Sequence, residues 1–248
     1  MTHKDKRKFL AIIPARYGSK RIPGKNIKSF CGKPLIYYSI KVAIESGIFD
    51  RVIVDTDSKK IAKIAIKYGA EVPFLRPAEL AEDNSKIGDV VVFLLKRLKK
   101  EQGYKPDAIS LLQTTSPLRE LSDLMKCFEV MSDNRIKSVC TVCETSPWFL
   151  NLSSKKRIFL INQETKKSTN TQDVPMGYAF NGCMVYMVKT AEFLKTKKFV
   201  DIDNKGETVG VICPKWRSVD LDNKEDWIMA EFLYKNKKRI EKQLNHFK

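Results

Sequence analysis

Histidine is almost missing from this sequence. The chain has 248 residues and two histidines, His3 and His246, which lie in its two tails. Histidine is the side chain that most often transfers protons near neutral pH. An active site that relies on an imidazole as general base is therefore not expected here.

Long hydrophobic runs are also absent. No apolar stretch approaches the roughly 20 residues that a helix needs to span a bilayer. The first residues, MTHKDKRKFLAII, hold no hydrophobic stretch long enough for a secretory signal. We therefore expect a cytoplasmic protein that has no membrane partner.

The cysteines do not form the framework of a small secreted protein. The six residues lie mostly inside apolar segments: Cys31, Cys127, Cys140, Cys143, Cys183 and Cys213. We expect them to be reduced and buried. Cys140 and Cys143 have a metal-like spacing, but they fall in an expected strand with no second pair or nearby histidine, so a zinc site is not favoured.

Acidic residues are scarce relative to basic ones, 29 against 46, which gives a formal net charge of +17. Such a charge raises the question of nucleic acid. The lysines are spread through every segment, and no zinc-finger spacing, basic heptad region or interleaving of aromatic with basic residues occurs. A solvated lysine-rich surface is favoured over a nucleic-acid interface, and a small anionic substrate is compatible with either.

Hydrophobic periodicity predicts one α/β domain over residues 1–248, with strands and helices in alternation. The expected strands cover 9–13, 51–56, 71–74, 108–113, 138–144, 181–188 and 208–213. The expected helices cover 34–47, 57–69, 87–100, 119–131 and 190–196, with a last one from about Lys224. This order predicts a Rossmann-like, mainly parallel sheet with helices on both faces. Residues 145–180 break the rhythm and read as an excursion from the core.

The loop after the first strand, 14-PARYGSKRIPGKN-26, has the composition of a phosphate-binding loop. Gly18 and Gly24 allow close approach of the backbone. Positive charge comes from four side chains, Arg16, Lys20, Arg21 and Lys25. The spacing is neither that of a Walker A loop nor that of a dinucleotide fingerprint. The alternative is a basic surface loop.

Asp220 and Asp222 form a D-x-D pair before the last helix. In an extended chain this spacing places both carboxylates on one side. Two such oxygen ligands suit Mg²⁺, which keeps several waters and bridges phosphates. The alternative is that Asp222 caps the helix that follows. The residues alone do not decide between these two readings.

Several motifs together resemble the CMP-sialic acid synthetase (acylneuraminate cytidylyltransferase) family. The loop is followed by 32-GKPLI-36, and 49-FDRVIVDTD-57 is similar to FD-x-V-x-V-S-T-D of that family. Further matches are 76-RPAELAED-83 to R-P-x-x-L-A-x-D, 111-LLQTTSPLR-119 to L-L-Q-P-T-S-P-L-R, then 181-NG-182 and 220-DLD-222. The resemblance implies a nucleotidyltransferase fold and transfer of CMP from CTP to a nine-carbon acidic sugar, with release of pyrophosphate.

The resemblance also implies roles for individual residues. Nucleotide binding falls to Ala15, Arg16, Ser19, Lys20, Lys25, Asn26, Arg76 and Ser85, and sugar binding to Gln113, Tyr178 and Asn181. Arg16, Lys25, Asp220 and Asp222 are implied as catalytic, the two aspartates as Mg²⁺ ligands. Alternatively, Arg76 forms a salt bridge with Glu79 or Asp83, and Gln113 caps the loop 114–119. The sugar hydroxyl would lose its proton to an aspartate or a metal-bound hydroxide, and the sequence leaves this choice open.

One part of the pattern is missing. Sialic-acid-specific members carry arginines shortly before the N-G, where this chain has Thr171 and Ala179. A lysine among Lys155, Lys156, Lys166 and Lys167 would bind a carboxylate as a point charge, without the two-pronged geometry of arginine. We therefore expect a related nonulosonic acid, of the legionaminic or pseudaminic type, or another acid as the acceptor.

The excursion at 145–180 matches the position of the dimerisation arm of the family. Its apolar residues would form a costly patch on a monomer: Trp148, Phe149, Leu150, Ile158, Phe159 and Leu160. A two-fold homodimer is the expected assembly. Two other functions stay open, a cytidylyltransferase for the eight-carbon acid Kdo and a nucleic-acid-binding or scaffold protein without turnover.

Overall fold

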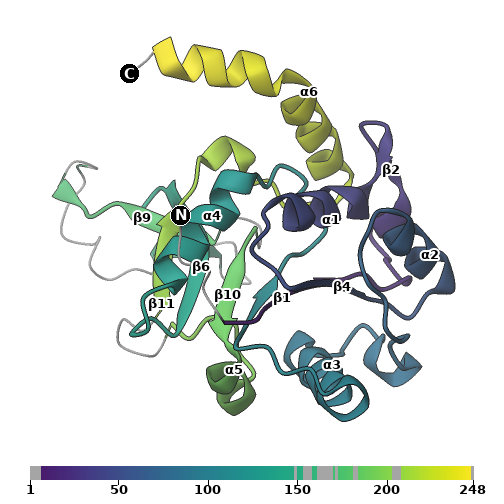
Figure 1. The fold of residues 1–248 in the computed structure, drawn as a ribbon. Helices are drawn as coiled ribbons and strands as arrows, with labels where there is room; N and C mark the ends of the chain where they lie inside the picture. Colours follow the sequence, from purple (N-terminus) through teal and green to yellow (C-terminus); the bar gives the residue numbers. More distant parts are fainter. Residues whose placement is uncertain are drawn as a thin grey trace.

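A seven-stranded sheet forms the centre of the molecule in the computed structural model (Figure 1). The structure describes residues 7–147, 150–152, 158–160, 170, 173–180, 184–202 and 208–246. The strands lie in the order β11 (Thr208–Ile212), β6 (Ser138–Thr145), β10 (Tyr186–Lys189), β5 (Ala108–Leu111), β1 (Phe9–Pro14) and β4 (Arg51–Asp55), and β9 (Gly177–Phe180) pairs with β6. Five of these seven strands run in one direction. The expected α/β fold with a mainly parallel sheet is confirmed.

The strands that oppose this direction are β10 and β9. β10 lies between β5 and β6 and is antiparallel to both, so Tyr186 faces Leu111 on one side and Cys140 on the other. β9 extends the same edge of β6. The alternation of strands and helices did not predict this reversal, since periodicity reports burial and not direction.

Three strand predictions need correction. Residues 71–74 form no strand: Glu71 makes a single bridge to Ile53, and Pro73 lacks the N–H that a ladder needs. β5 ends at Leu111, so Gln113 lies beyond the strand. In the predicted strand 181–188, the described part begins its pairing only at Tyr186.

Helices cover both faces of the sheet. One face packs against α1 (Leu35–Glu45), α2 (Lys59–Lys67) and α4 (Leu121–Met131). The other face packs against α3 (Ile87–Gln102) and α5 (Thr190–Thr196) (Figure 1). Ser58 caps α2 by accepting a hydrogen bond from the amide of Ile61. Burial on both faces explains why the central strands are continuously apolar.

The last helix, α6 (Lys224–His246), begins against the body and then extends away from it (Figure 1). A separate apolar cluster anchors its first turns: Ile22, Phe30, Leu35, Tyr38, Leu221, Trp227 and Ala230. The ring of Phe30 packs edge-on against Trp227, with the centroids 5.5 Å apart. Ile22 belongs to the basic loop and Leu221 lies between the two aspartates, so this cluster joins both segments to α6.

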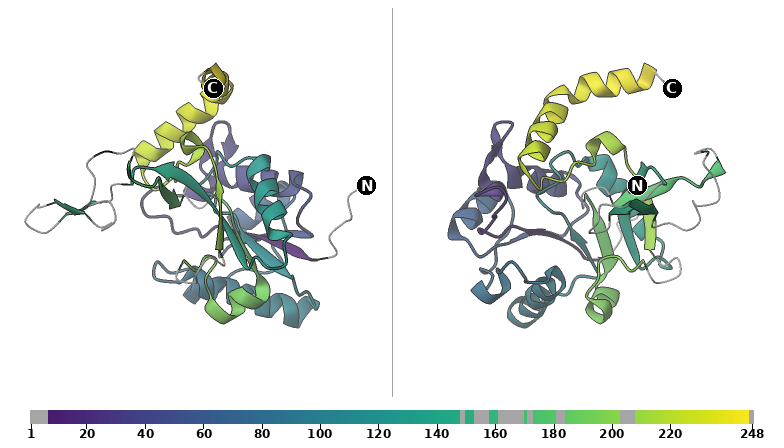
Figure 2. Two further views of the ribbon diagram at one scale, coloured as in Figure 1. Left: turned by 90° about the vertical axis from the view of Figure 1, so that its left-hand side faces the viewer. Right: turned by 180° about the vertical axis from the view of Figure 1, so that it is seen from behind.

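The excursion at 145–180 contains a two-stranded hairpin, β7 (Leu150–Leu152) with β8 (Ile158–Leu160), besides β9. Figure 2 shows the hairpin projecting from the body of the molecule. The exposure expected for Trp148, Phe149 and the apolar residues of the hairpin lies outside the side chains that the structure describes. None of the described helices is long and apolar enough to cross a membrane.

Candidate active site

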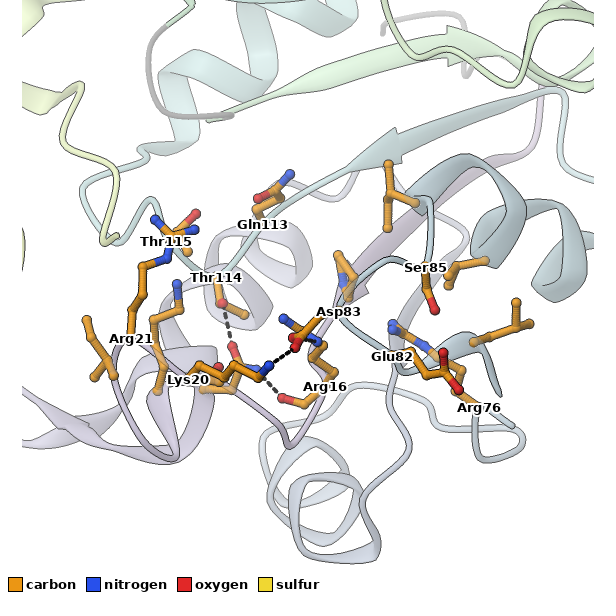
Figure 3. Close-up of a pocket in the computed structure, with 18 residues that line it drawn as sticks. Arg16, Lys20, Arg21, Arg76, Glu82, Asp83, Ser85, Gln113, Thr114 and Thr115 are labelled. Carbon is orange, nitrogen blue, oxygen red and sulfur yellow. Dashed lines mark hydrogen bonds and ion pairs between the residues drawn. The ribbon is translucent and has the colours of Figure 1, made fainter. Parts of the chain in front are cut away.

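A cavity of about 310 Å³ opens at the carboxyl ends of β1 and β5. This edge is the expected place for a ligand in an open parallel sheet. Its walls come from the basic loop after β1, the segment 76–90 and residues 113–115 after β5. Figure 3 shows Arg21 and Thr115 at one end, Arg76, Glu82 and Ser85 at the other, and Lys20, Asp83 and Arg16 between them.

The basic loop supplies most of the positive charge. It turns at Gly24, whose φ of 63° lies in the left-handed region that glycine adopts at little cost. Arg16 and Lys20 both form ion pairs with Asp83, which reaches across from the segment after Arg76 (Figure 3). These hydrogen bonds hold the pKa of Asp83 below its usual value. Two cations of the loop therefore contact the same carboxylate, that of Asp83.

Asn26 ties this loop to the segment that follows β5. Its side chain is buried, donates to the carbonyl of Arg16 at 2.8 Å and accepts from the hydroxyl of Thr114 at 2.6 Å. A side-chain amide that is hydrogen-bonded through both its nitrogen and its oxygen has a fixed orientation. The structure thus gives Asn26 a role in shaping the loop, and its predicted contact with the nucleotide stays a prediction.

Lys25 lies between the loop and the aspartate pair. Its ammonium group donates to the carbonyl of Leu221 at 2.8 Å. Burial lowers the pKa of Lys25, and the nearby charges of Asp222 and Asp220 oppose that shift. Arg21 forms an ion pair with Asp222 at 2.9 Å. The structure therefore brings Lys25, Asp220 and Asp222 together, and their predicted roles in catalysis stay predictions.

The backbone around the aspartates is a tight turn and not the extended chain that we expected. The amide of Asp222 donates to the carbonyl of Asp220 at 2.9 Å, and the amide of Leu221 donates to Thr115 at 3.0 Å. Asp222 does not cap α6. Asn223 accepts from the amide of Asp226, whose carboxylate accepts in return from the amides of Asp222 and Asn223. The carboxylate of Asp222 is instead paired with Arg21 of the basic loop.

Asp220 is the candidate metal ligand with the clearest signature. Its Oδ1 atom is buried and makes no hydrogen bond within the described residues. Burial raises the pKa of Asp220 and Asp222 raises it further, whereas Thr115 and Lys25 act in the opposite direction. An unpartnered buried carboxylate oxygen is costly unless a ligand completes it. No group of three His, Cys, Asp or Glu side chains forms a metal site in the described part of the chain. Two carboxylates that share a cation with phosphates fit Mg²⁺.

Arg76 lines the far end of the cavity and is almost fully buried. Its partner is Asp55 at the end of β4, with 2.8 Å between Nη2 and Oδ2. The salt bridge with Glu79 or Asp83 that was considered as an alternative is therefore wrong. The reason lies in the topology, because β4 ends beside the segment that carries Arg76 and delivers a buried carboxylate to it.

Gln113 lines the cavity with its side chain, which makes no hydrogen bond to a described residue (Figure 3). Its backbone carbonyl accepts from Ser39 at 3.1 Å and from the buried Arg119 at 2.7 Å. Arg119 therefore fixes the backbone of Gln113 and leaves the amide side chain for a ligand. The side chain of Gln113 does not cap the loop 114–119, because the contact with Arg119 at the end of that loop is made by the backbone carbonyl of Gln113.

The remaining predicted residues are distributed unevenly. Ser19 and Ser85 line the cavity, whereas Ala15 is buried beneath it and its amide donates to Asp55 at 2.9 Å. Tyr178 lies exposed on β9 and is not among the described residues that line the cavity. Asn181, Thr171 and the four lysines predicted as a clamp lie outside the described residues.

The sequence did not predict the acidic partners of the site: Asp55 was not singled out, and Asp83 was considered only as a partner of Arg76, whereas it pairs with Arg16 and Lys20. Both stand inside motifs that carried the resemblance, and Asp83 is 67 residues from Arg16. The only signal in the sequence was their negative charge. Asp55 ends a predicted strand, and Asp83 lies in the segment that begins with Arg76. Their exact partners follow only from the spatial order of the strands.

The chain also matches a known family along most of its length. Residues 10–236 match the profile described as cytidylyltransferase. The chain belongs to the cytidylyltransferase family. The expected resemblance is thereby confirmed, and the protein is a nucleotidyltransferase.

Named relatives of this cytidylyltransferase agree with that assignment. CMP-N,N'-diacetyllegionaminic acid synthase of Legionella pneumophila is 32% identical over 230 residues, which cover 91% of this chain and 96% of that protein. Pseudaminic acid cytidylyltransferase of Campylobacter jejuni is 33% identical over 233 residues, covering 92% and 97%. A solved CMP-2-keto-3-deoxy-manno-octonic acid synthetase in complex with CTP has a TM-score of 0.65 at 16% identity, covering 93% of this chain and 99% of that one. This last similarity shows a shared fold.

Proposed function

We propose that this cytidylyltransferase transfers CMP from CTP to a nonulosonic acid and releases pyrophosphate. The observation that carries the proposal is the cavity lined by the cations of the basic loop, one of which, Lys25, also donates to the carbonyl of Leu221 between the two aspartates. The names of the relatives, which act on legionaminic and pseudaminic acids, support the class of acceptor.

The two ends of the cavity suit the two ends of CTP. Arg16, Lys20, Arg21 and Lys25 form the cationic part and would hold the triphosphate. Arg76 and Ser85 lie at the other end (Figure 3), and the segment that carries them also contributes the apolar lining residues Leu80, Ile87 and Val90. This end of the cavity has fewer cations than the other and would receive the nucleoside.

In the reaction, the anomeric hydroxyl oxygen of the sugar bonds to the α-phosphorus, and the bond from that phosphorus to the β-phosphate oxygen breaks. The proton of the hydroxyl passes to a base that this chain does not identify. Positioning and neutralisation of phosphate charge supply most of the catalysis in such transfers. Arg16 and Lys25 are the cations that we assign to this task.

Asp220 and Asp222 would hold Mg²⁺, with the buried Oδ1 of Asp220 as one ligand atom. The cation, when bound, would neutralise charge on the phosphates and the leaving pyrophosphate. Gln113 would contact the sugar from the end of β5, and Tyr178 and Asn181 stay predicted sugar contacts. We propose one domain over residues 1–248, acting as a homodimer through the arm 145–180. The cytoplasm is its proposed location, since cells hold CTP there.

Pyrophosphate release tests the function directly. We expect release with CTP and a legionaminic- or pseudaminic-type acid, and a background rate with ATP or without sugar. Release with a Kdo-type acid alone would reassign the acceptor. No release with CTP and any α-keto acid sugar, from protein with a cooperative melting transition, would contradict the enzyme assignment and favour a binding or scaffold role.

Replacing Asp83 should strengthen the apparent binding of CTP. In Asp83→Asn the triphosphate no longer competes with a carboxylate for Arg16 and Lys20. Because exposed ion pairs contribute little, we expect KM for CTP to fall by about two- to fivefold. Glu101→Gln, which removes the partner of Arg97 on α3, is the matched control. A higher KM in Asp83→Asn would show instead that Asp83 helps to hold the nucleotide.

A further inference from the structure

A second buried oxygen without a hydrogen bond lies next to that of Asp220. Oγ1 of Thr115, like Oδ1 of Asp220, is buried and makes no hydrogen bond within the described residues. Burial raises the pKa of Asp220 and the Thr115 side chain opposes that shift, so the two side chains are neighbours. The adjacent Thr114, by contrast, donates its hydroxyl to Asn26 at 2.6 Å. Because an unpaired buried oxygen is costly, two of them at one place indicate that a ligand completes both.

Thr115 connects the cavity to the turn that carries the two aspartates. Its side chain, 9% exposed, lines the cavity beside Arg21 (Figure 3). Its backbone carbonyl accepts from the amide of Leu221 at 3.0 Å, and the carbonyl of Leu221 accepts from Lys25 at 2.8 Å. Thr115 and Lys25 therefore both line the cavity and hold the backbone between the aspartates. Of these two side chains, that of Thr115 is the one that offers an oxygen to a cation.

A hydroxyl at this point has the right chemistry for Mg²⁺. The cation prefers oxygen ligands in an octahedral arrangement, and a serine or threonine hydroxyl is a known neutral ligand of Mg²⁺ at triphosphate sites. Asp220 and Asp222 already supply two negative charges. A third oxygen without charge adds a contact and does not neutralise the cation further, so the positive charge stays available to the phosphates.

We propose that the hydroxyl of Thr115 is a third protein ligand of the cation that Asp220 and Asp222 would hold. The inference rests on the proposed function, which assigns the cation to the two aspartates. It adds a ligand from the segment after β5, so the cation would join the cavity wall to the turn before α6. The cation site then includes a residue that lines the cavity in which the phosphates would lie.

Binding of Mn²⁺ to the protein without substrates tests this assignment, with free Mn²⁺ followed by its electron paramagnetic resonance signal. Mn²⁺ is a suitable probe because it takes the same octahedral oxygen ligands as Mg²⁺. The isosteric Thr115→Val should raise the Kd for Mn²⁺ about tenfold, the lower end of the range for a group lost around a metal. Thr115→Ser keeps the hydroxyl and should stay within about twofold of the wild type.

Thr190→Val is the matched control. Thr190, at the start of α5, also has a buried hydroxyl oxygen without a hydrogen bond in the described part of the chain, but it is not among the described residues that line the cavity. This variant should bind Mn²⁺ as the wild type does. Both valine variants remove an unsatisfied buried hydroxyl, so without metal both should melt at or above the wild-type temperature. If Thr115→Val did not fold, Thr115→Ala would carry the same test.

Three results would overturn the inference: an unchanged Kd in a folded Thr115→Val or Thr115→Ala, equal losses in Thr115→Val and Thr115→Ser, or a wild type that binds no Mn²⁺. A protein that binds Mn²⁺ in the expected pattern but releases no pyrophosphate from CTP with any sugar would overturn the proposed function and leave the cation site in place. The two failures are therefore distinguishable.

Discussion

Asp222→Asn should lower kcat by about 100-fold at millimolar Mg²⁺, because one anionic ligand of the proposed cation is lost where phosphate charge must be neutralised. Asp222 is half-exposed, makes its ion pair with Arg21 at the surface and does not cap α6. Its removal should therefore leave the melting temperature nearly unchanged. The measurement is pyrophosphate release as a function of Mg²⁺ concentration, in which excess Mg²⁺ should restore part of the lost rate.

A matched control separates the metal role from the loss of any surface ion pair. Asp133 is paired with Arg135 at 2.7 Å, as Asp222 is with Arg21 at 2.9 Å. Asp133→Asn should keep wild-type turnover. Wild-type rates in Asp222→Asn would contradict the assignment, and so would a lower kcat whose Mg²⁺ dependence is unchanged, since Asp222 would then act through Arg21.

The second large effect concerns the acceptor. We expect kcat/KM for N-acetylneuraminate to be about 10- to 100-fold below that for a legionaminic- or pseudaminic-type acid, the factor that a lost charged hydrogen bond would produce. Thr171 and Ala179 stand where arginines would form the carboxylate clamp. Ala179 lies on β9 opposite Cys143, on the described part of the arm.

A substitution on β9 provides the comparison. Ala179→Arg should narrow the preference by improving turnover of N-acetylneuraminate. Ile212→Arg adds the same charge at an exposed position at the end of β11, which pairs with β6 rather than with β9, and should change nothing. Efficient use of N-acetylneuraminate by the wild type would show that other residues supply the clamp and that the interpretation of Thr171 and Ala179 is wrong.

The candidate site was predictable where it consists of one continuous segment. The basic loop and the glutamine after β5 line the cavity as their residue types and positions predicted, because strand ends of a parallel sheet meet at one edge. The acidic partners were not predictable, because Arg16 and Asp83 are 67 residues apart and Arg76 and Asp55 are 21 apart. Charge identifies a residue that needs a partner, but not which partner lies within reach.

By itself the sequence determined the α/β class, the positions of most helices and strands, and the family. These properties depend on local periodicity and on ordered motifs, which are present in the chain before it folds. Only the tertiary structure decided that β10 runs against its neighbours, that Asp220 and Asp222 meet in a tight turn, and that Asp55 faces Arg76. The physical reason is that these features depend on contacts between distant segments, where the buried ends of neighbouring strands bring together side chains that no local pattern connects.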